Sequence, residues 1–377
     1  MIFPAIAGLA IVLTILWDAF ETVVLPRRVA RRFRLSRLFY IFTWAPWRGI
    51  ACLIQRSKQR ETFLSYYGPL SLFFLLAVWA GVLILGFGFL YYSASSQAVS
   101  SHALLTCIYL SGTTFFTLGL GDVTAHTWTG RWLAVAESGL GFGFLALVLS
   151  YLPVIYQAFS RREVSIVLLD ARAGSPPTAA ELLRRHAGPQ GLEALENLLH
   201  EWERWSAQIL ESHVSYPVVS YFRSQHNNES WVAALAAILD TCALLIACGE
   251  SGLARQSRLT FAMCRHTVVD LTQVFHRRPL HASTDRLPPA DLHRLRTTLT
   301  QAGFQLRDTS ATNDKLLKLR GMYEPYLQAL AEFLSMDLPP WILAKEISDN
   351  WKTSAWGRIA GFASPEAGEA STDDHSD

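Results

Sequence analysis

The sequence predicts an all-α protein, with a membrane module in the first 160 residues and a helical cytoplasmic domain after it. Three observations lead to this prediction. Apolar runs of about the length that spans a bilayer alternate with polar segments before residue 160. Lys and Arg are distributed unevenly between those runs. After residue 160, apolar residues recur mainly at the i, i+3, i+4 spacing of an amphipathic helix.

The first expected element is an N-terminal transmembrane helix over residues 1–25. The arginines that flank its apolar run come after it, whereas a secretory signal carries them before. Asp18 and Glu21 share one face near the cytoplasmic end of this helix. Because carboxylates inside a membrane are costly and usually paired, we expect them to bind arginines of the segment 27–37. The alternative is a pair that senses ions or protons.

The distribution of basic residues predicts the orientation of the chain. Ten Lys or Arg residues stand between residues 26 and 62, whereas residues 93–130 contain none. Positively charged loops remain on the cytoplasmic side of a membrane. We therefore expect a multi-pass protein of the cell's inner (plasma) membrane, with its N-terminus outside and residues 26–62 and 161–377 in the cytoplasm.

The basic segment 26–62 contains an apolar stretch from Leu38 to Ile54. Basic clusters flank it on both sides, so a spanning helix would place one cluster outside. We expect a helix that lies on the inner leaflet, with Trp44 and Trp47 at the level of the headgroups. Its basic flanks would bind anionic membrane lipids.

Arginines in this segment also recur at every third position, at Arg28, Arg31, Arg34 and Arg37. This is the spacing of a voltage-sensing helix. Additional arginines interrupt the pattern, and only one helix precedes it. These features favour a basic juxtamembrane helix over a voltage sensor.

Residues 113–124, TTFFTLGLGDVT, contain the pattern T-x-x-T-x-G-x-G-D. A dehydrated potassium ion needs rings of oxygen atoms, and a backbone segment supplies them if successive carbonyls face one axis. Glycine at every second position permits this, since Gly119 and Gly121 can enter left-handed conformations without a Cβ clash. The expected ion-binding residues are Thr117, Leu118, Gly119, Leu120 and Gly121. A glycine-containing turn can match such a pattern by accident, so the flanking segments must support it.

The flanking segments do support it. We expect an outer helix over Tyr66–Tyr92 and an inner helix over Trp132–Tyr156, each long enough to span. The helix expected over Ser101–Phe116 is too short to span and would be re-entrant. In this order of elements, residues 66–160 resemble the pore module of the potassium channel family.

The resemblance implies passive, selective conduction of K⁺, which would be the permeant ion and not a cofactor. One chain carries one pore loop, and four loops are needed to close a filter, so we expect a cyclic homotetramer. We expect no other cofactor and no nucleic-acid partner.

The filter departs from the usual T-V-G-Y-G-D of that family at two positions, Leu118 and Leu120. Leucine at the second position resembles some filters of two-pore-domain potassium channels. Without an aromatic hydroxyl at position 120, that residue cannot form a hydrogen bond that ties the filter to the pore helix, which is the short helix expected over Ser101–Phe116. A weakly selective monovalent cation channel is therefore an alternative function.

Glu137 is a lone carboxylate in the outer half of the expected inner helix. The pore helix has Thr113 where some members of the potassium channel family carry a supporting glutamate. We expect Glu137 to support the filter from behind, together with Thr113, Thr114 and Asp122, the last of which caps the outer mouth with negative charge.

The inner helix also contains the residues expected to form the gate. Glycine lacks side-chain restraint, and Gly141 best matches the hinge position of the potassium channel family. Pro153 removes one helix hydrogen bond, and so we expect the helices to converge below it, where Tyr156 and Phe159 close the pore. For Gly139 and Gly143 the alternative of close helix packing is equally favoured.

Residues 161–360 are expected to fold as a helical cytoplasmic domain, and the acidic tail 361–377 to be disordered. Val164–Leu169 could form a strand, but no glycine-rich nucleotide-binding motif follows it. Trp231–Cys248 is apolar enough to span, yet crossing would carry three arginines outside, so we expect a buried helix. Thr178 is expected to begin a helix, and further helices are expected over 252–276, 290–302 and 313–335.

His213–Asn228 is rich in histidines and aromatic residues around a proline. It could form a ligand or ion sensor, with Glu211, His213, His226 and Glu229 as candidate ligands. The spacing matches no known metal motif, which favours a polar joint between helices.

Motifs of enzymes are absent from the sequence: it has no G-x-S-x-G, no Walker loop and no H-E-x-x-H. We therefore expect no enzymatic activity. A membrane-tethered receptor that acts through residues 161–360 is the remaining alternative.

Overall fold

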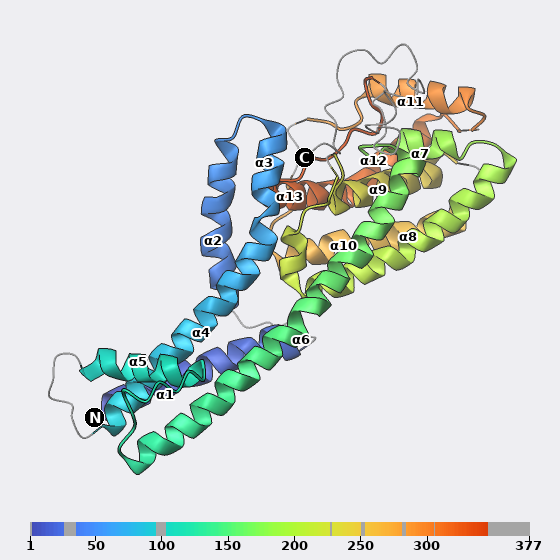
Figure 1. The fold of residues 1–377 in the computed structure, drawn as a ribbon. Helices are drawn as coiled ribbons and strands as arrows, with labels where there is room; N and C mark the ends of the chain where they lie inside the picture. Colours follow the sequence, from blue (N-terminus) through green and yellow to red (C-terminus); the bar gives the residue numbers. More distant parts are fainter. Residues whose placement is uncertain are drawn as a thin grey trace, which may run out of the picture. The chain divides into compact units, whose positions relative to one another are not determined.

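A computed structural model describes residues 2–25, 35–95, 103–226, 228–249, 253–280, 284–304 and 306–345. These residues form helices joined by turns and contain no β-strand, which confirms the all-α prediction (Figure 1). Arg28, Arg31 and Arg34 and the predicted tail 361–377 lie outside the described residues. The chain divides into two compact units, Met1–Gln157 and Ala158–Asp377.

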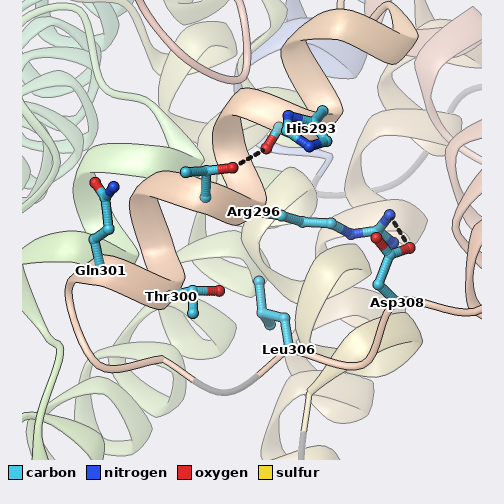
Figure 2. A pocket seen from close by; sticks show the side chains of 7 residues that line it. His293, Arg296, Thr300, Gln301, Leu306 and Asp308 are labelled. Carbon is cyan, nitrogen blue, oxygen red and sulfur yellow. Dashed lines mark hydrogen bonds and ion pairs between the residues drawn. The ribbon is translucent and has the colours of Figure 1, made fainter.

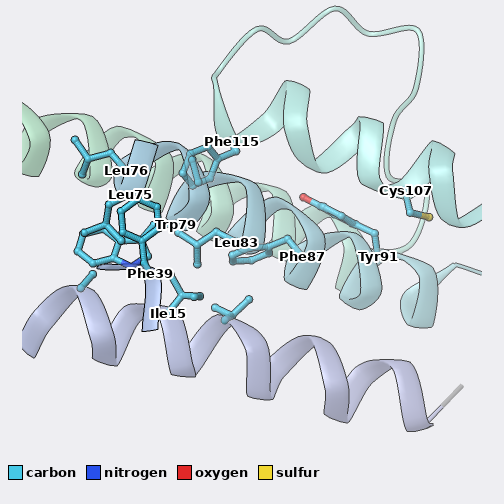
Figure 3. Packing of buried hydrophobic residues seen from close by; sticks show 13 residues of the cluster. Ile15, Phe39, Leu75, Leu76, Trp79, Leu83, Phe87, Tyr91, Cys107 and Phe115 are labelled. Carbon is cyan, nitrogen blue, oxygen red and sulfur yellow. The ribbon is translucent and has the colours of Figure 1, made fainter. Parts of the chain in front are cut away.

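The first unit is built around α1 (Ile2–Ala19), extended by the π-helical η1 (Phe20–Val24), and α4 (Tyr67–Ala94). Glycines let the two helices approach closely: a Cβ on Gly8 would lie 2.6 Å from the carbonyl oxygen of Gly86. Such small residues replace the hydrophobic effect as the basis of helix packing in a membrane. Large side chains of α4, among them Trp79, Leu83 and Phe87, fill the core of this unit (Figure 3).

The predicted interfacial helix is α2 (Leu35–Cys52), which packs against α3 (Ser57–Ser65) and the start of α4. The ring of Trp44 is buried, with its centroid 4.7 Å from that of Tyr67, and its place at the level of the headgroups stays a prediction. Trp47 stacks on Phe63 with 4.5 Å between ring centroids. Aromatic side chains of α3 and α4 therefore hold the face of α2 that carries the tryptophans.

Asp18 has donors that differ from the expected arginines. Its carboxylate accepts hydrogen bonds from the backbone N–H of Ser36, at 3.1 Å, and from Trp79 Nε1, at 3.0 Å. Ser36 lies in the first turn of α2, where backbone N–H groups have no partner within the helix. Asp18 thus caps α2, and its charge interacts favourably with the positive end of the helix dipole.

Four helices of the described chain are long and apolar enough to cross a membrane, in the ranges Ile2–Val23, Ser57–Ala94, Trp128–Ala173 and Trp231–Cys248. The first three bury 28%, 50% and 17% of their most apolar window, but the fourth buries 94%. A spanning helix needs a face toward lipid, and the fourth has none left. The protein is a membrane protein, and α9 (Trp231–Cys248) is a core helix of the second unit.

In the second unit, other helices surround α9. They are α7 (Ala179–Arg185), α8 (Pro189–Ser215), α10 (Ala254–Val274), α12 (Ser310–Gly321) and α13 (Glu324–Leu334), with α11 (Pro289–Gln301) packed on α7. The side chain of Thr178 accepts a hydrogen bond from Glu181 N–H and begins α7 as predicted. Val164–Leu169, a possible strand from its sequence, is helical. The single helix predicted over 313–335 is wrong, because the chain turns at Met322 and Tyr323 and forms two helices.

A buried ion pair links α9 to the surrounding helices. The carboxylate of Asp240 accepts hydrogen bonds from both terminal nitrogens of Arg286, at 2.6 and 3.3 Å, and from the hydroxyl of Tyr323, at 2.6 Å. Burial raises the pKa of Asp240 to about 6, and the charge of Arg286 opposes that effect. The carboxylate is therefore ionised at neutral pH and fully supplied with donors.

Candidate functional site: a re-entrant loop

The short apolar helix before the T-x-x-T-x-G-x-G-D pattern is α5 (Ala103–Phe115), close to the predicted bounds of 101–116. It packs on α4, where a Cβ on Gly88 would lie 2.7 Å from the side chain of Ile108. The long α6 (Trp128–Ala173) follows the pattern and continues well beyond the predicted end of the inner helix. The loop from Phe116 to Thr127 is thus held between two helices.

The backbone of this loop alternates in handedness. Thr117, Gly119 and Gly121 have φ angles of +56°, +59° and +78°, whereas Leu118 and Leu120 have negative φ. Alternation of left- and right-handed residues is the pattern that turns successive carbonyl groups toward the same side. Glycine is favoured at positions 119 and 121 by the positive φ angles and not by a lack of space, since a Cβ on either residue would meet nothing within 4 Å.

The positive φ of Thr117 is a feature that the sequence did not predict. A β-branched residue at positive φ is an outlier that costs of the order of 1–3 kcal/mol. Such strain persists only where the surroundings determine it. Here Thr117 N–H donates to the carbonyl of Thr114 at 3.0 Å, and Leu118 N–H donates to that of Thr113 at 2.8 Å. The acceptors are backbone carbonyls of Thr113 and Thr114, and support of the filter by their side chains stays a prediction.

Asp122, at the far end of the loop, is tied to the pore helix. The hydroxyl of Tyr109 donates to its carboxylate at 2.9 Å. The filter pattern pointed only to position 120 as the source of such a hydroxyl. A tyrosine on the facing side of α5, thirteen residues earlier, could have been found from helical periodicity together with the re-entrant geometry.

Glu137 lies behind the loop, fully buried on α6. Its carboxyl group is within hydrogen-bond reach of the hydroxyl of Ser111 on α5. The same hydroxyl lies 2.9 Å from the carbonyl of Ile84 on α4. Three helices therefore meet at one polar contact, in the place predicted for Glu137.

Gly141 lies at a close contact between α6 and α5, and its role as a hinge stays a prediction. A Cβ at this position would lie only 2.0 Å from the carbonyl oxygen of Phe115, at the end of α5. Glycine is thus required here for close packing of α6 on α5. Gly139 and Gly143 have nothing within 4 Å of an added Cβ, so packing within this chain does not explain them.

The residues predicted to form the gate lie along the lower half of α6, which continues through Pro153. Tyr156 is 43% exposed. The ring of Phe159 instead packs 5.5 Å from that of Phe222 and 5.2 Å from the guanidinium of Arg162, all within the second unit. These contacts hold the ring of Phe159, and its role as a ring that closes the pore stays a prediction.

The candidate sensor residues do not form a metal site. Among the residues that the structure describes, no three His, Cys, Asp or Glu side chains come together as ligands. His213 is buried against Trp231 and the guanidinium of Arg162. Burial lowers the pKa of His213 well below its usual value, and the charge of Arg162 acts in the same direction. His213 is therefore a neutral residue of a joint between helices.

The second unit contains a cavity of about 300 Å³ beside α11 (Figure 2). It is lined by His293, Arg296, Thr297, Thr300, Gln301, Leu306 and Asp308. The guanidinium of Arg296 already binds Asp308 at 2.5 Å and Asn313 at 2.6 Å. Its positive charge is thus neutralised, and the cavity has no feature that selects an anion.

Comparison with known proteins agrees with this geometry. Residues 79–157 match the model of a family described as ion channel. Over 282 residues the chain is 21% identical to an uncharacterized membrane protein, YdjJ, of Bacillus subtilis, a match that covers 72% of this chain and 81% of the relative. Over 89 residues it is 35% identical to the protein LctB of Geobacillus stearothermophilus, covering 20% of this chain and 66% of that protein. No solved structure gives a significant match.

The matched range contains the end of α4, the re-entrant α5, the alternating loop and the membrane part of α6. This chain therefore carries a potassium-channel-like ion channel pore module.

Proposed function

We propose that the protein is a potassium-selective channel that conducts K⁺ passively through a pore formed by four identical chains. The observation that carries the proposal is the alternating backbone of Thr117, Gly119 and Gly121 at the end of a re-entrant helix. Rings of carbonyl oxygens from four such loops would replace the water around a dehydrated K⁺ ion. One loop per chain supports four-fold assembly.

The side chains of Leu118 and Leu120 support the same assignment. They are 60% and 63% exposed in the single chain, although both are apolar. In a tetramer they would pack against neighbouring pore helices while their carbonyls face the axis. A family of ion channels also favours transport over catalysis as the activity.

A weakly selective cation channel is the second candidate, because Leu120 has no hydroxyl to stiffen the loop. The hydrogen bond from Tyr109 to Asp122 favours the selective channel. It supplies a tie between the pore helix and the outer end of the loop by a different route.

We propose the orientation that the basic residues indicate, with the N-terminus outside and the second unit in the cytoplasm. Anionic lipids of the inner leaflet are proposed to bind near α2. Support comes from its basic flanks and from one exposed apolar face, made of Leu38, Ile41, Phe42, Ile50 and Leu53.

Single-channel recording from the purified protein in planar bilayers tests this function. We expect discrete K⁺ currents, and a mass in detergent equal to four chains. Gly119→Ala is the matched variant: Cβ meets no neighbour, yet φ of +59° strains alanine by about 1–2 kcal/mol in each chain. Its selective current should disappear. Selective conduction by Gly119→Ala channels would contradict the assignment of the filter.

A further inference from the structure

Among the described residues of the second unit, Arg162 is the most deeply buried cation, and its side chain is fully inaccessible. It lies on α6, three residues after Phe159, where the helix has left its membrane part. Neither conduction nor ion selectivity requires a cation at this position.

The guanidinium of Arg162 binds a segment far away in sequence. Nη1 donates to the carbonyl of Val219 at 3.0 Å, and Nη2 donates to that of Phe222 at 2.8 Å. These carbonyls belong to the short 3₁₀ helix η2 (Pro217–Tyr221) and to the residue after it. This segment, termed here the joint segment 217–222, connects α8 to the loop before α9.

The positive charge and the remaining Nε donor of Arg162 are paired with Glu163. Nε donates to Glu163 Oε1 at 2.9 Å, and the same oxygen lies 2.8 Å from Nη2. The backbone carbonyl of Arg162 accepts a hydrogen bond from Trp205 Nε1 on α8, at 3.3 Å. Leaving a buried cation without partners costs several kcal/mol, so the contacts of Arg162 hold together as a set.

His213 completes the contacts from the side of α8. Its Nε2 lies 3.5 Å from Nη1 of Arg162, and its Nδ1 lies 3.0 Å from the hydroxyl of Ser212. As a neutral ring it accepts from the guanidinium and does not repel it. At Arg162, α6 is thus bound both to α8 and to the joint segment.

We propose that Arg162 is the positioning residue that couples the second unit to the pore, by fixing α6 at this point to the joint segment 217–222. The inference rests on the proposed function, since α6 would be the pore-lining helix. A movement of α8 or of the joint segment displaces Arg162, and Arg162 carries α6 with it. The planar guanidinium carries its donors on three nitrogens in a fixed fork and so spans two carbonyls and a carboxylate, whereas lysine would have to donate from a single nitrogen.

Full-length channels in planar bilayers, with Arg162→Lys and Arg162→Met, test the coupling. Open probability should change at least about fivefold in both variants, while unit conductance and reversal potential stay as in the wild type. The control is Arg172→Gln on the same helix, whose pair with Glu201 is exposed; its open probability should remain unchanged.

Hydrogen exchange of the joint segment separates coupling from a general loss of stability. Amides of residues 217–222 should exchange at least about tenfold faster in the Arg162 variants, with little change in α9 and α10. A loosened joint segment with wild-type open probability would overturn the proposal, as would unchanged exchange in both variants. If the wild type carries no K⁺ current, the proposed function fails, and the exchange result still decides whether Arg162 holds the joint segment.

Discussion

At the scale of single residues, the hydrogen bonds around Glu137 bear on whether its carboxyl group carries a proton. The hydroxyl of Ser111 has one hydrogen, yet both the carbonyl of Ile84 and the carboxyl of Glu137 are within its reach. If Glu137 carries a proton, it donates to Ser111, and Ser111 donates to Ile84. Since Glu137 is fully buried, the neutral acid also avoids the cost of an unpaired charge.

We therefore predict that Glu137→Gln channels resemble the wild type, because the amide nitrogen can donate to Ser111 in the same way. Glu137→Ala should change open probability or selectivity by about tenfold, since the loss of this contact costs of the order of 1–3 kcal/mol. Single-channel recording distinguishes the two variants. Equal behaviour of Gln and Ala variants would reduce Glu137 to a packing residue.

A second prediction concerns Tyr109, whose hydroxyl holds Asp122. Tyr109→Phe removes this hydrogen bond and keeps the ring. We expect a less rigid outer mouth, seen as lower K⁺-over-Na⁺ selectivity or as brief closures in single-channel records. Tyr66→Phe, at another exposed tyrosine, is the control and should have no effect. If both variants behave as the wild type does, a filter with Leu120 does not depend on the hydrogen bond between Tyr109 and Asp122.

At the scale of elements, α5 and α6 meet at Gly141. A Cβ there would lie 2.0 Å from the carbonyl of Phe115, so Gly141→Ala must push the two helices apart. We predict a loss of about 1–3 kcal/mol in the stability of the pore module. Thermal dissociation of the tetramer in detergent measures it.

Gly143→Ala is the matched control, because its Cβ would meet nothing within 4 Å of this chain. It should leave the dissociation temperature within roughly a degree or two of the wild-type value. Should Gly143→Ala destabilise the tetramer as much as Gly141→Ala does, close packing on α5 is not the reason for Gly141.

These elements show how far sequence reasoning reaches. Periodicity and apolar length are local properties, and they correctly predicted α4, α5 and α9. Left-handed backbone at Gly119 and Gly121 also followed from residue type alone. Thr117 did not, because a β-branched residue takes positive φ only when neighbouring hydrogen bonds impose it.

The partners of individual side chains could not be predicted from the sequence. The sequence could not show that Gly141 faces a carbonyl of α5, or that Phe159 packs on Phe222. Asp18 was assigned to nearby arginines by sequence distance, whereas its donors are Ser36 and, 61 residues away, Trp79. Contacts between distant segments are set by the packing of whole helices.

At the scale of the whole molecule, the asymmetry of basic residues predicts one orientation. An engineered cysteine at Ser57, the first residue of α3, should react with an impermeant thiol reagent only in permeabilised or inverted membranes. The chain's own exposed Cys52 must first be replaced by serine. Labelling at position 57 from outside intact cells would reverse the topology and remove the basis for a cytoplasmic second unit.

The central claim is that four loops of residues 117–121 form a potassium-selective pore, and a reversal potential tests it most directly. Purified channels would be placed in a bilayer with K⁺ on one side and Na⁺ at equal concentration on the other. We predict a reversal potential that corresponds to a permeability for K⁺ at least about tenfold that for Na⁺, as expected of a carbonyl filter. A reversal potential near zero would contradict the account and identify a weakly selective cation channel instead.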